Sequence, residues 1–160
     1  WYYEIIAPGF KYNMTDMAAA LGVVQLNKLT AMTDRRVAIA SRYNAAFSGH
    51  DALETPTQSP DSTHAYHLYV LRLNLDALRI DRSEFMGRLR ALNIGTSVHF
   101  IPLHIHPYYR RLYGYSPIDF PMAYREYTRA FSLPIFPDMT DQDVEDVISA
   151  VLAVADEYAV

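Results

Sequence analysis

Apolar residues recur at helical spacing over a long early part of the chain, residues 17–47. Thr15 precedes this stretch as an expected N-cap, and Asp16 falls in the first turn, where the helix dipole favours a negative charge. We predict two consecutive helices with a bend at residues 29–33, because two threonines there are weak helix formers. Gly22 costs about 1 kcal/mol relative to alanine inside a helix, so it predicts a close contact with another backbone.

The rest of the chain alternates between strand-like and helix-like patterns. A strand that begins at residue 1 leads us to expect a piece of a longer protein. Gly95 is expected to be a left-handed helix cap, and Thr140 with Asp143 matches a capping box. We predict strands over residues 1–6, 66–73 and 96–101, and a loop over 50–63. Helices are expected from 81 or 83 to 92, over 122–131 and from 141 to about 158, and a short helix or turn over 108–115.

This order of elements predicts the fold class. A strand, long helices, a strand, a helix, a strand and further helices are typical of an α+β sandwich, in which helices cover one face of a mostly antiparallel sheet. A length of 160 residues suggests one domain or slightly more. No internal repeat or low-complexity segment interrupts the pattern.

Composition narrows the possible partners. Hydrophobic residues make up 51% and charged residues 20%, as in a globular domain. A net charge of −4 argues against nucleic acid or an anionic membrane as the main partner, since both select a basic surface. The absence of cysteine excludes disulfides and thiolate metal sites and fits a cytoplasmic location. Only Lys11 and Lys28 are available to any mechanism that needs a lysine.

The turn at residues 9–16 is the first candidate site. Unpaired N–H groups at a helix start attract anions, and Lys11 adds a positive charge, so a phosphate could bind here. A plain helix cap with a solvated lysine explains the same pattern, and the pattern alone favours it.

The second candidate lies at residues 98–109, directly after a predicted strand, and contains His99, His104 and His106. The spacing of the last two could suit a metal, but no Asp, Glu or Cys completes a ligand set, so we do not expect a metal site. A polar pocket wall fits better, because imidazole and phenol groups bind sugar hydroxyls and phosphate oxygens. Packing beneath a loop remains an alternative for Tyr108 and Tyr109.

Other patterns carry less information. In the segment 64–67, His64 and Tyr66 share one face and His67 lies on the other, and core packing and a pocket edge both remain open. The chain contains no nucleophile elbow, dinucleotide fingerprint or P-loop. Four carboxylates on expected helix exteriors are interpreted as solvating charges: Glu126, Glu145, Asp146 and Glu157.

Taken together and in order, several segments resemble the C-terminal part of the DegT/DnrJ/EryC1/StrS family. These are fold-type I enzymes that depend on pyridoxal 5'-phosphate and mostly aminate nucleotide-linked keto sugars. Each motif alone is weak, but the joint order is specific and covers nearly the whole chain. The matching stretches are residues 9–22 (GFKYNMTDMAAALG), 25–26, 35–43, 64–70 (HAYHLYV), 95–109 (GTSVHFIPLHIHPYY), 113–115 and 132–143 (SLPIFPDMTDQD).

The resemblance implies a domain division and a cofactor contact. Residues 1–29 would end the cofactor-binding large domain and form a linker helix, and residues 30–160 would form the small C-terminal domain. The turn that contains Lys11 and Asn13 would reach across a homodimer interface to the cofactor phosphate in the neighbouring subunit. Many members have Asn-Tyr-Arg where this chain has Lys-Tyr-Asn, which leaves open whether Lys11 or Asn13 touches the phosphate.

The resemblance also implies a substrate wall formed by His99 and His104, with His106 and Tyr108 as further candidates. The substrate would be a nucleotide-linked keto-deoxysugar for polysaccharide or a glycosylated metabolite, and the amino donor glutamate. Neither lysine lies in the motif of the family's cofactor lysine, so we expect this segment alone to be inactive and to contain no catalytic residue. Two alternatives remain: a non-catalytic dimerisation or sensor module, and a dehydratase-like branch in which histidine replaces that lysine.

Overall fold

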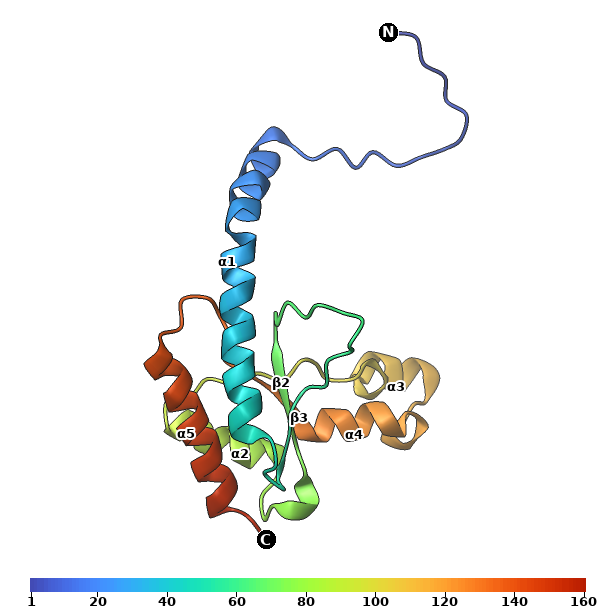
Figure 1. Cartoon of the computed structure of the whole chain (residues 1–160). Coiled ribbons are helices and arrows are strands. Elements are labelled where there is room, and N and C mark those ends of the chain that lie inside the picture. Colours follow the sequence, from blue (N-terminus) through green and yellow to red (C-terminus); the bar gives the residue numbers. More distant parts are fainter.

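The computed structural model describes residues 1–160 and contains one small sheet with five α-helices (Figure 1). Three short 3₁₀ helices, η1 (Leu75–Ala77), η2 (Leu103–Ile105) and η3 (Pro117–Asp119), connect them. The main elements are α1 (Asp16–Phe47), β1 (Leu53–Glu54), β2 (Tyr69–Leu73), α2 (Arg82–Ala91), α3 (Pro107–Tyr113), α4 (Pro121–Arg129), β3 (Ala130–Leu133) and α5 (Asp141–Glu157).

α1 is one unbroken helix of 32 residues, which corresponds to a length of about 48 Å. The side chain of Thr15 accepts a hydrogen bond from the N–H of Ala18, which confirms the predicted N-cap. The predicted bend at residues 29–33 is wrong. Threonine lowers helix stability by less than about 1 kcal/mol, and this small propensity cost does not break a helix whose later turns are held by packing.

The sheet is antiparallel in the order β1–β2–β3, with Leu53 paired to Leu73 and Tyr69 paired to Leu133. β2 alternates between two environments. Tyr69, Leu71 and Leu73 are fully buried on the side of α1 and α5, whereas the residues between them face α4. This alternation follows from the two-residue period of a strand.

The hydrophobic core lies between the sheet and the helices α1, α2 and α5, and α3 and α4 project from the other side (Figure 1). Twenty-four buried apolar residues form this single cluster. The ring centroids of Tyr43 on α1 and Tyr69 on β2 are 5.0 Å apart. The cluster draws on β1–β3, α2, α5 and the C-terminal half of α1, so these elements share one core.

α5 begins at the predicted capping box. The Oγ1 of Thr140 accepts from the N–H of Asp143 at 3.1 Å, and the Asp143 carboxylate accepts from the N–H of Thr140 at 2.8 Å. Hydrogen bonds from the Thr140 hydroxyl and N–H hold the pKa of Asp143 below its usual value. The apolar residues at helical spacing along α5 form a stripe that faces the core. Val144, Val147, Ile148, Val151 and Ala155 are buried, and Leu152 is partly buried.

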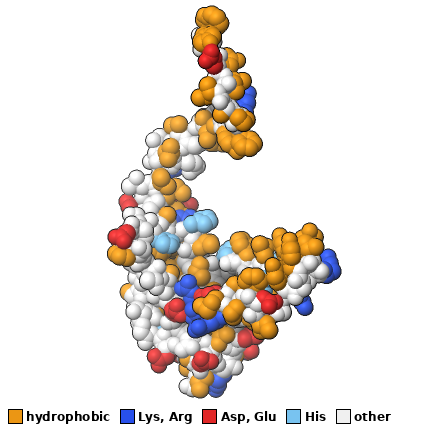
Figure 2. Space-filling view, turned by 90° about the vertical axis from the view of Figure 1, so that its right-hand side faces the viewer, with side chains coloured by type: hydrophobic (Ala, Val, Ile, Leu, Met, Phe, Trp, Pro, Cys, Tyr) orange, Lys and Arg blue, Asp and Glu red, His pale blue; other side chains and the backbone are white.

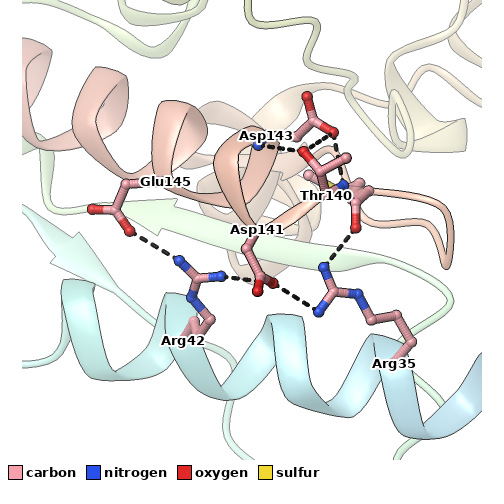
Figure 3. Close-up of polar contacts among 7 residues, drawn as sticks. Arg35, Arg42, Thr140, Asp141, Asp143 and Glu145 are labelled. Carbon is pink, nitrogen blue, oxygen red and sulfur yellow. Dashed lines mark hydrogen bonds and ion pairs between the residues drawn. The ribbon is translucent and has the colours of Figure 1, made fainter.

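Two arginines of α1 form ion pairs with the first turn of α5 (Figure 3). Arg35 and Arg42 both contact one oxygen of Asp141, at 3.0 and 3.2 Å, and Arg42 also reaches Glu145 at 3.0 Å. A second nitrogen of Arg35 donates to the carbonyl oxygen of Met139 at 2.5 Å. These contacts fix the direction in which α1 leaves the domain.

Two predicted strands and one cap are corrected. Residues 1–6 form no strand, because no other strand of this chain lies beside them to complete the hydrogen bonds. Residues 96–101 form only one bridge, between Ser97 and Ser132, since β3 is just four residues long. Asn93, with φ of 64°, takes the left-handed conformation expected for Gly95. Asparagine tolerates this conformation better than most residues.

Residues 1–29 extend away from the domain, and almost all of their side chains are exposed (Figures 1 and 2). A side-chain carbon placed on Gly22 would meet no atom within 4 Å, so the predicted close backbone contact does not form within this chain. The large exposed apolar residues here are Trp1, Tyr2, Tyr3, Ile5, Ile6, Phe10, Tyr12, Met14, Met17, Leu21, Val23, Val24, Leu26 and Leu29. No helix is both long and apolar enough to cross a membrane.

Candidate functional site

The phosphate candidate, residues 9–14, lies in the exposed segment that precedes α1. Lys11 and Asn13 are exposed, and neither makes a side-chain hydrogen bond or ion pair within the chain. The Thr15 cap turns the segment into the helix. The turn therefore presents an ammonium and an amide at the far end of α1, separated from the body of the domain by the projecting half of that helix.

The imidazole of His99 is held by a residue that is distant in sequence. The bridge between Ser97 and Ser132 places residue 99 beside β3, where His99 Nδ1 lies 2.9 Å from the Oγ of Ser132. Ser132 is 5% exposed, and His99 is the only side chain that pairs with its hydroxyl. The Nε2 of His99 has no hydrogen-bond partner within the chain.

His99 separates two hollows. One, of about 280 Å³, lies against α4 and is lined by apolar groups together with Arg72 and Glu126. The other, of about 180 Å³, is lined by His67, Ser97, His99 and Ser132 with apolar neighbours; we call it the imidazole–hydroxyl cavity. Figure 2 shows histidine side chains where the body of the domain is hollowed below the projecting N-terminal part.

The other predicted wall residues have different environments. His104 is only 7% exposed, its ring lies 4.8 Å from that of Phe120, and its Nε2 is buried without a partner. His106 donates through Nε2 to the carbonyl oxygen of Ile101 at 3.2 Å. Tyr108 is exposed on α3 beside Tyr109, with ring centroids 5.2 Å apart.

The structure therefore brings His99 and His67 to one cavity and does not bring His104 there. It also separates both from Lys11 and Asn13 within a single chain. No group of three or more potential metal-ligating side chains occurs in the protein.

Arg36 was not identified by the sequence patterns. Its Nη1 donates to the carbonyl oxygens of Tyr66, His67 and Ile135, at 3.1, 3.4 and 2.9 Å. Arg36 thereby ties α1 to two backbone segments that border the imidazole–hydroxyl cavity. One sequence feature could have indicated this role. The pair Arg35-Arg36 interrupts the apolar pattern of the predicted helix.

A closed ring of charges supports the larger hollow. Glu126 accepts from Arg72 at 2.7 Å and from Arg129 at 2.6 Å, and Glu54 pairs with the same two arginines. Partial burial would raise the pKa of Glu126, but the hydrogen bonds from Arg129 and Arg72 outweigh it and hold the pKa below its usual value. Glu126 is thus a structural ion-pair residue and not simply a solvating charge.

Comparison with known proteins decides the family. The DegT/DnrJ/EryC1/StrS aminotransferase family matches residues 1–152. The chain belongs to this family. Its fold is that of the small C-terminal domain of fold-type I enzymes, as the sequence predicted.

Two curated relatives and one solved structure illustrate the match. MJ1066 of Methanocaldococcus jannaschii, described as uncharacterized, is 52% identical over 98% of this chain, and the spore coat polysaccharide biosynthesis protein SpsC of Bacillus subtilis is 51% identical over 94%. Spr1654 of Streptococcus pneumoniae, described as a sugar aminotransferase and solved in its PLP form, is 29% identical over 98% of the chain, with a TM-score of 0.81. The chain spans 41%, 39% and 40% of these proteins, about two fifths of their length.

Proposed function

We propose that this chain is the C-terminal part of an aminotransferase that moves an amino group from glutamate to a nucleotide-linked keto-deoxysugar. Membership of the aminotransferase family supports the reaction class, and the similarity to a spore coat polysaccharide biosynthesis protein supports a sugar substrate. The observation that carries the proposal is the exposed turn at residues 9–14, which offers Lys11 and Asn13 to a group outside this chain's own fold.

The turn fits a phosphate and does not fit a covalent cofactor site. A lysine that binds the cofactor must lie in a pocket beside the cofactor ring, whereas Lys11 and Lys28 are both exposed. An exposed ammonium, an amide and the N–H groups of the capped start of α1 are suitable partners for a phosphate dianion. Pyridoxal 5'-phosphate would supply the electron-withdrawing ring for amino transfer, while residues of this chain would hold its phosphate.

The substrate wall would be formed mainly by His99. Its unpartnered Nε2 and the neighbouring hollows suit sugar hydroxyls or phosphate oxygens. Tyr108 is accessible for the same role. His104 and His106 stay candidates as well, although His104 must turn outward from its packing against Phe120 before it can touch a substrate.

The experiment uses the full-length protein that contains this chain. It would be incubated with ¹⁵N-labelled glutamate and a panel of nucleotide-linked keto-deoxysugars, and ¹⁵N in the sugar product would be measured by mass spectrometry. Lys11→Ala combined with Asn13→Ala should weaken cofactor retention and amination at least tenfold. Lys28→Ala, which removes the other exposed lysine, is the matched control and should leave both unchanged. No labelled sugar with any substrate would contradict the proposal.

A further inference from the structure

We propose that Ser132 is a positioning residue, whose buried hydroxyl orients the ring of His99 and fixes the tautomer in which Nε2 carries the proton. The inference rests on the proposed function, because it names the group that prepares one residue of the proposed substrate wall. Ser132 acts through His99 and not through a contact of its own with a reactant.

Ser132 occupies a position where a hydroxyl has no packing advantage. Its neighbours on β3, Phe131 and Leu133, belong to the core, so the two-residue period turns Ser132 to the opposite face. There it is paired across the sheet with Val70 and is only 5% exposed. Alanine would fill this position without a polar group, whereas a buried hydroxyl costs free energy unless it makes a hydrogen bond. The hydroxyl therefore depends on its one partner, Nδ1 of His99 at 2.9 Å.

The orientation of the His99 ring depends in turn on Ser132. Two backbone hydrogen bonds between Ser97 and Ser132, of 2.7 and 3.2 Å, bring this segment beside β3. His99 is otherwise exposed, and the aromatic ring beside it belongs to Phe100, which is itself 78% exposed. An exposed phenylalanine restrains a neighbouring ring only weakly, so the bond to Ser132 decides where Nε2 points.

The burial of the hydroxyl also selects the tautomer. When Nδ1 is bare, the hydroxyl of Ser132 donates to it and Nε2 carries the ring proton. When Nδ1 carries the proton, the ring donates to Oγ, and the hydroxyl proton is left buried with no acceptor in the chain. The cost of an unsatisfied buried hydroxyl corresponds to a preference of about tenfold for the first state. The neutral ring of His99 therefore offers a donor, Nε2–H, which suits the oxygen atoms of a keto sugar.

Nuclear magnetic resonance reads the tautomer directly. The 160-residue chain would be labelled with ¹⁵N in its histidines and studied at about pH 8, where an ordinary imidazole is neutral. Correlations between ring nitrogens and ring protons show which nitrogen carries the proton, and His99→Asn identifies the signals of His99 by their loss. His50 is the reference, because its Nδ1 accepts from the N–H of Ala52 and leaves the proton on Nε2. We expect His99 to show the same pattern as His50.

Variants of Ser132 test whether its hydroxyl is the cause. With Ser132→Ala, the ring of His99 should move toward the mixed tautomers of a free imidazole, while the signals of His50 stay unchanged. Ser132→Thr keeps the hydroxyl, and the hollow beside it gives room for the added methyl group, so the wild-type pattern should return. Ser41→Ala removes a hydroxyl that bonds only to Val37 within α1 and should change nothing.

Kinetics of the full-length protein that contains this chain supply the second readout. Ser132→Ala should lower kcat/KM for the keto sugar about tenfold, the size of one hydrogen bond, and Ser132→Thr should restore it. The value of kcat/KM for glutamate should not change, because the wall is assigned to the sugar. A general loss of folding would lower both values together, and threonine would not rescue it.

The inference and the proposed function fail separately. A proton on Nδ1 of His99 in the wild-type chain, or a tautomer that Ser132→Ala leaves unchanged, would overturn the positioning role even if the full-length enzyme aminates sugars. An unchanged kcat/KM for the sugar in Ser132→Ala would also overturn it, since the ring would then be oriented for no ligand. The expected tautomer and its loss in Ser132→Ala, without amination of any sugar, would instead overturn the proposed function and leave Ser132 as the residue that orients His99.

Discussion

Arg72 on β2 donates through Nε to the carboxylate of Glu126 on α4 at 2.7 Å, although the two residues are 54 positions apart. This contact fixes α4 on the face of the sheet that does not contain the core. Both members of the ion pair line the same hollow as His99.

Replacing Glu126 should loosen this attachment. Glu126→Gln keeps the size of the side chain but removes the charge shared by Arg72 and Arg129, and we expect a loss of about 1 kcal/mol in the free energy of unfolding. Urea unfolding followed by circular dichroism would measure it. Glu84→Gln, which breaks only an exposed pair with Arg88 on α2, is the control and should cost less than half as much.

The same ring predicts a dependence of stability on pH. Since the pKa of Glu126 is lower in the folded state than its ordinary value of 4.5, its contribution is present above that value and is lost as pH falls through the folded-state pKa. The stability difference between wild type and Glu126→Gln should therefore shrink in acid. A difference that stays constant from pH 6 down to the acid transition would contradict the assignment.

The capping box at the start of α5 should matter more than the cap of α1. Thr140→Ala should destabilise the domain by about 1 kcal/mol, because α5 supplies seven buried residues to the core. Thr15→Ala removes a simpler cap, one hydrogen bond from the N–H of Ala18, from the projecting end of α1. It should leave the global unfolding transition unchanged and cause only local fraying, which amide hydrogen exchange would detect.

Arg36 should stabilise two segments at once. Arg36→Met keeps the length of the side chain but removes the nitrogen that donates to the three carbonyl oxygens, and we expect a loss of about 1–3 kcal/mol in the free energy of unfolding. Amide exchange should rise at residues 66–68 and 134–136. The control is Arg79→Met, which affects an exposed arginine whose side chain donates to a single carbonyl oxygen, that of Glu157. Equal effects of the two changes would show that the triple contact has no special role.

Local signals predicted the fold well. The caps at Thr15 and Thr140 and the apolar stripe of α5 depend on residues within a few positions of one another, so their patterns are visible in the sequence. β2 begins three residues later than expected, because Tyr66 adopts a positive φ of 44° and the segment there is held by Arg36 from α1. Such tertiary contacts leave no local signal.

The candidate site was predicted only in part. The histidine-rich segment was found from composition, and His99 does line cavities. The partner of His99, Ser132, lies 33 positions away, and only strand pairing brings the two together. Burial of His104 against Phe120 likewise follows from the path of the chain through η3, which the spacing of histidines does not encode.

The most direct test of the central claim, that Lys11 and Asn13 serve a neighbouring subunit, is subunit mixing with the full-length protein. One variant carries Lys11→Ala and Asn13→Ala, and the other lacks the cofactor lysine outside this chain. Alone, the first should be strongly weakened in amination and the second inactive. If active sites are shared, mixed dimers contain one site with both defects and one intact site, so amination should reappear after mixing. Mixed dimers that form but remain inactive would place the turn in its own subunit's site and contradict the account.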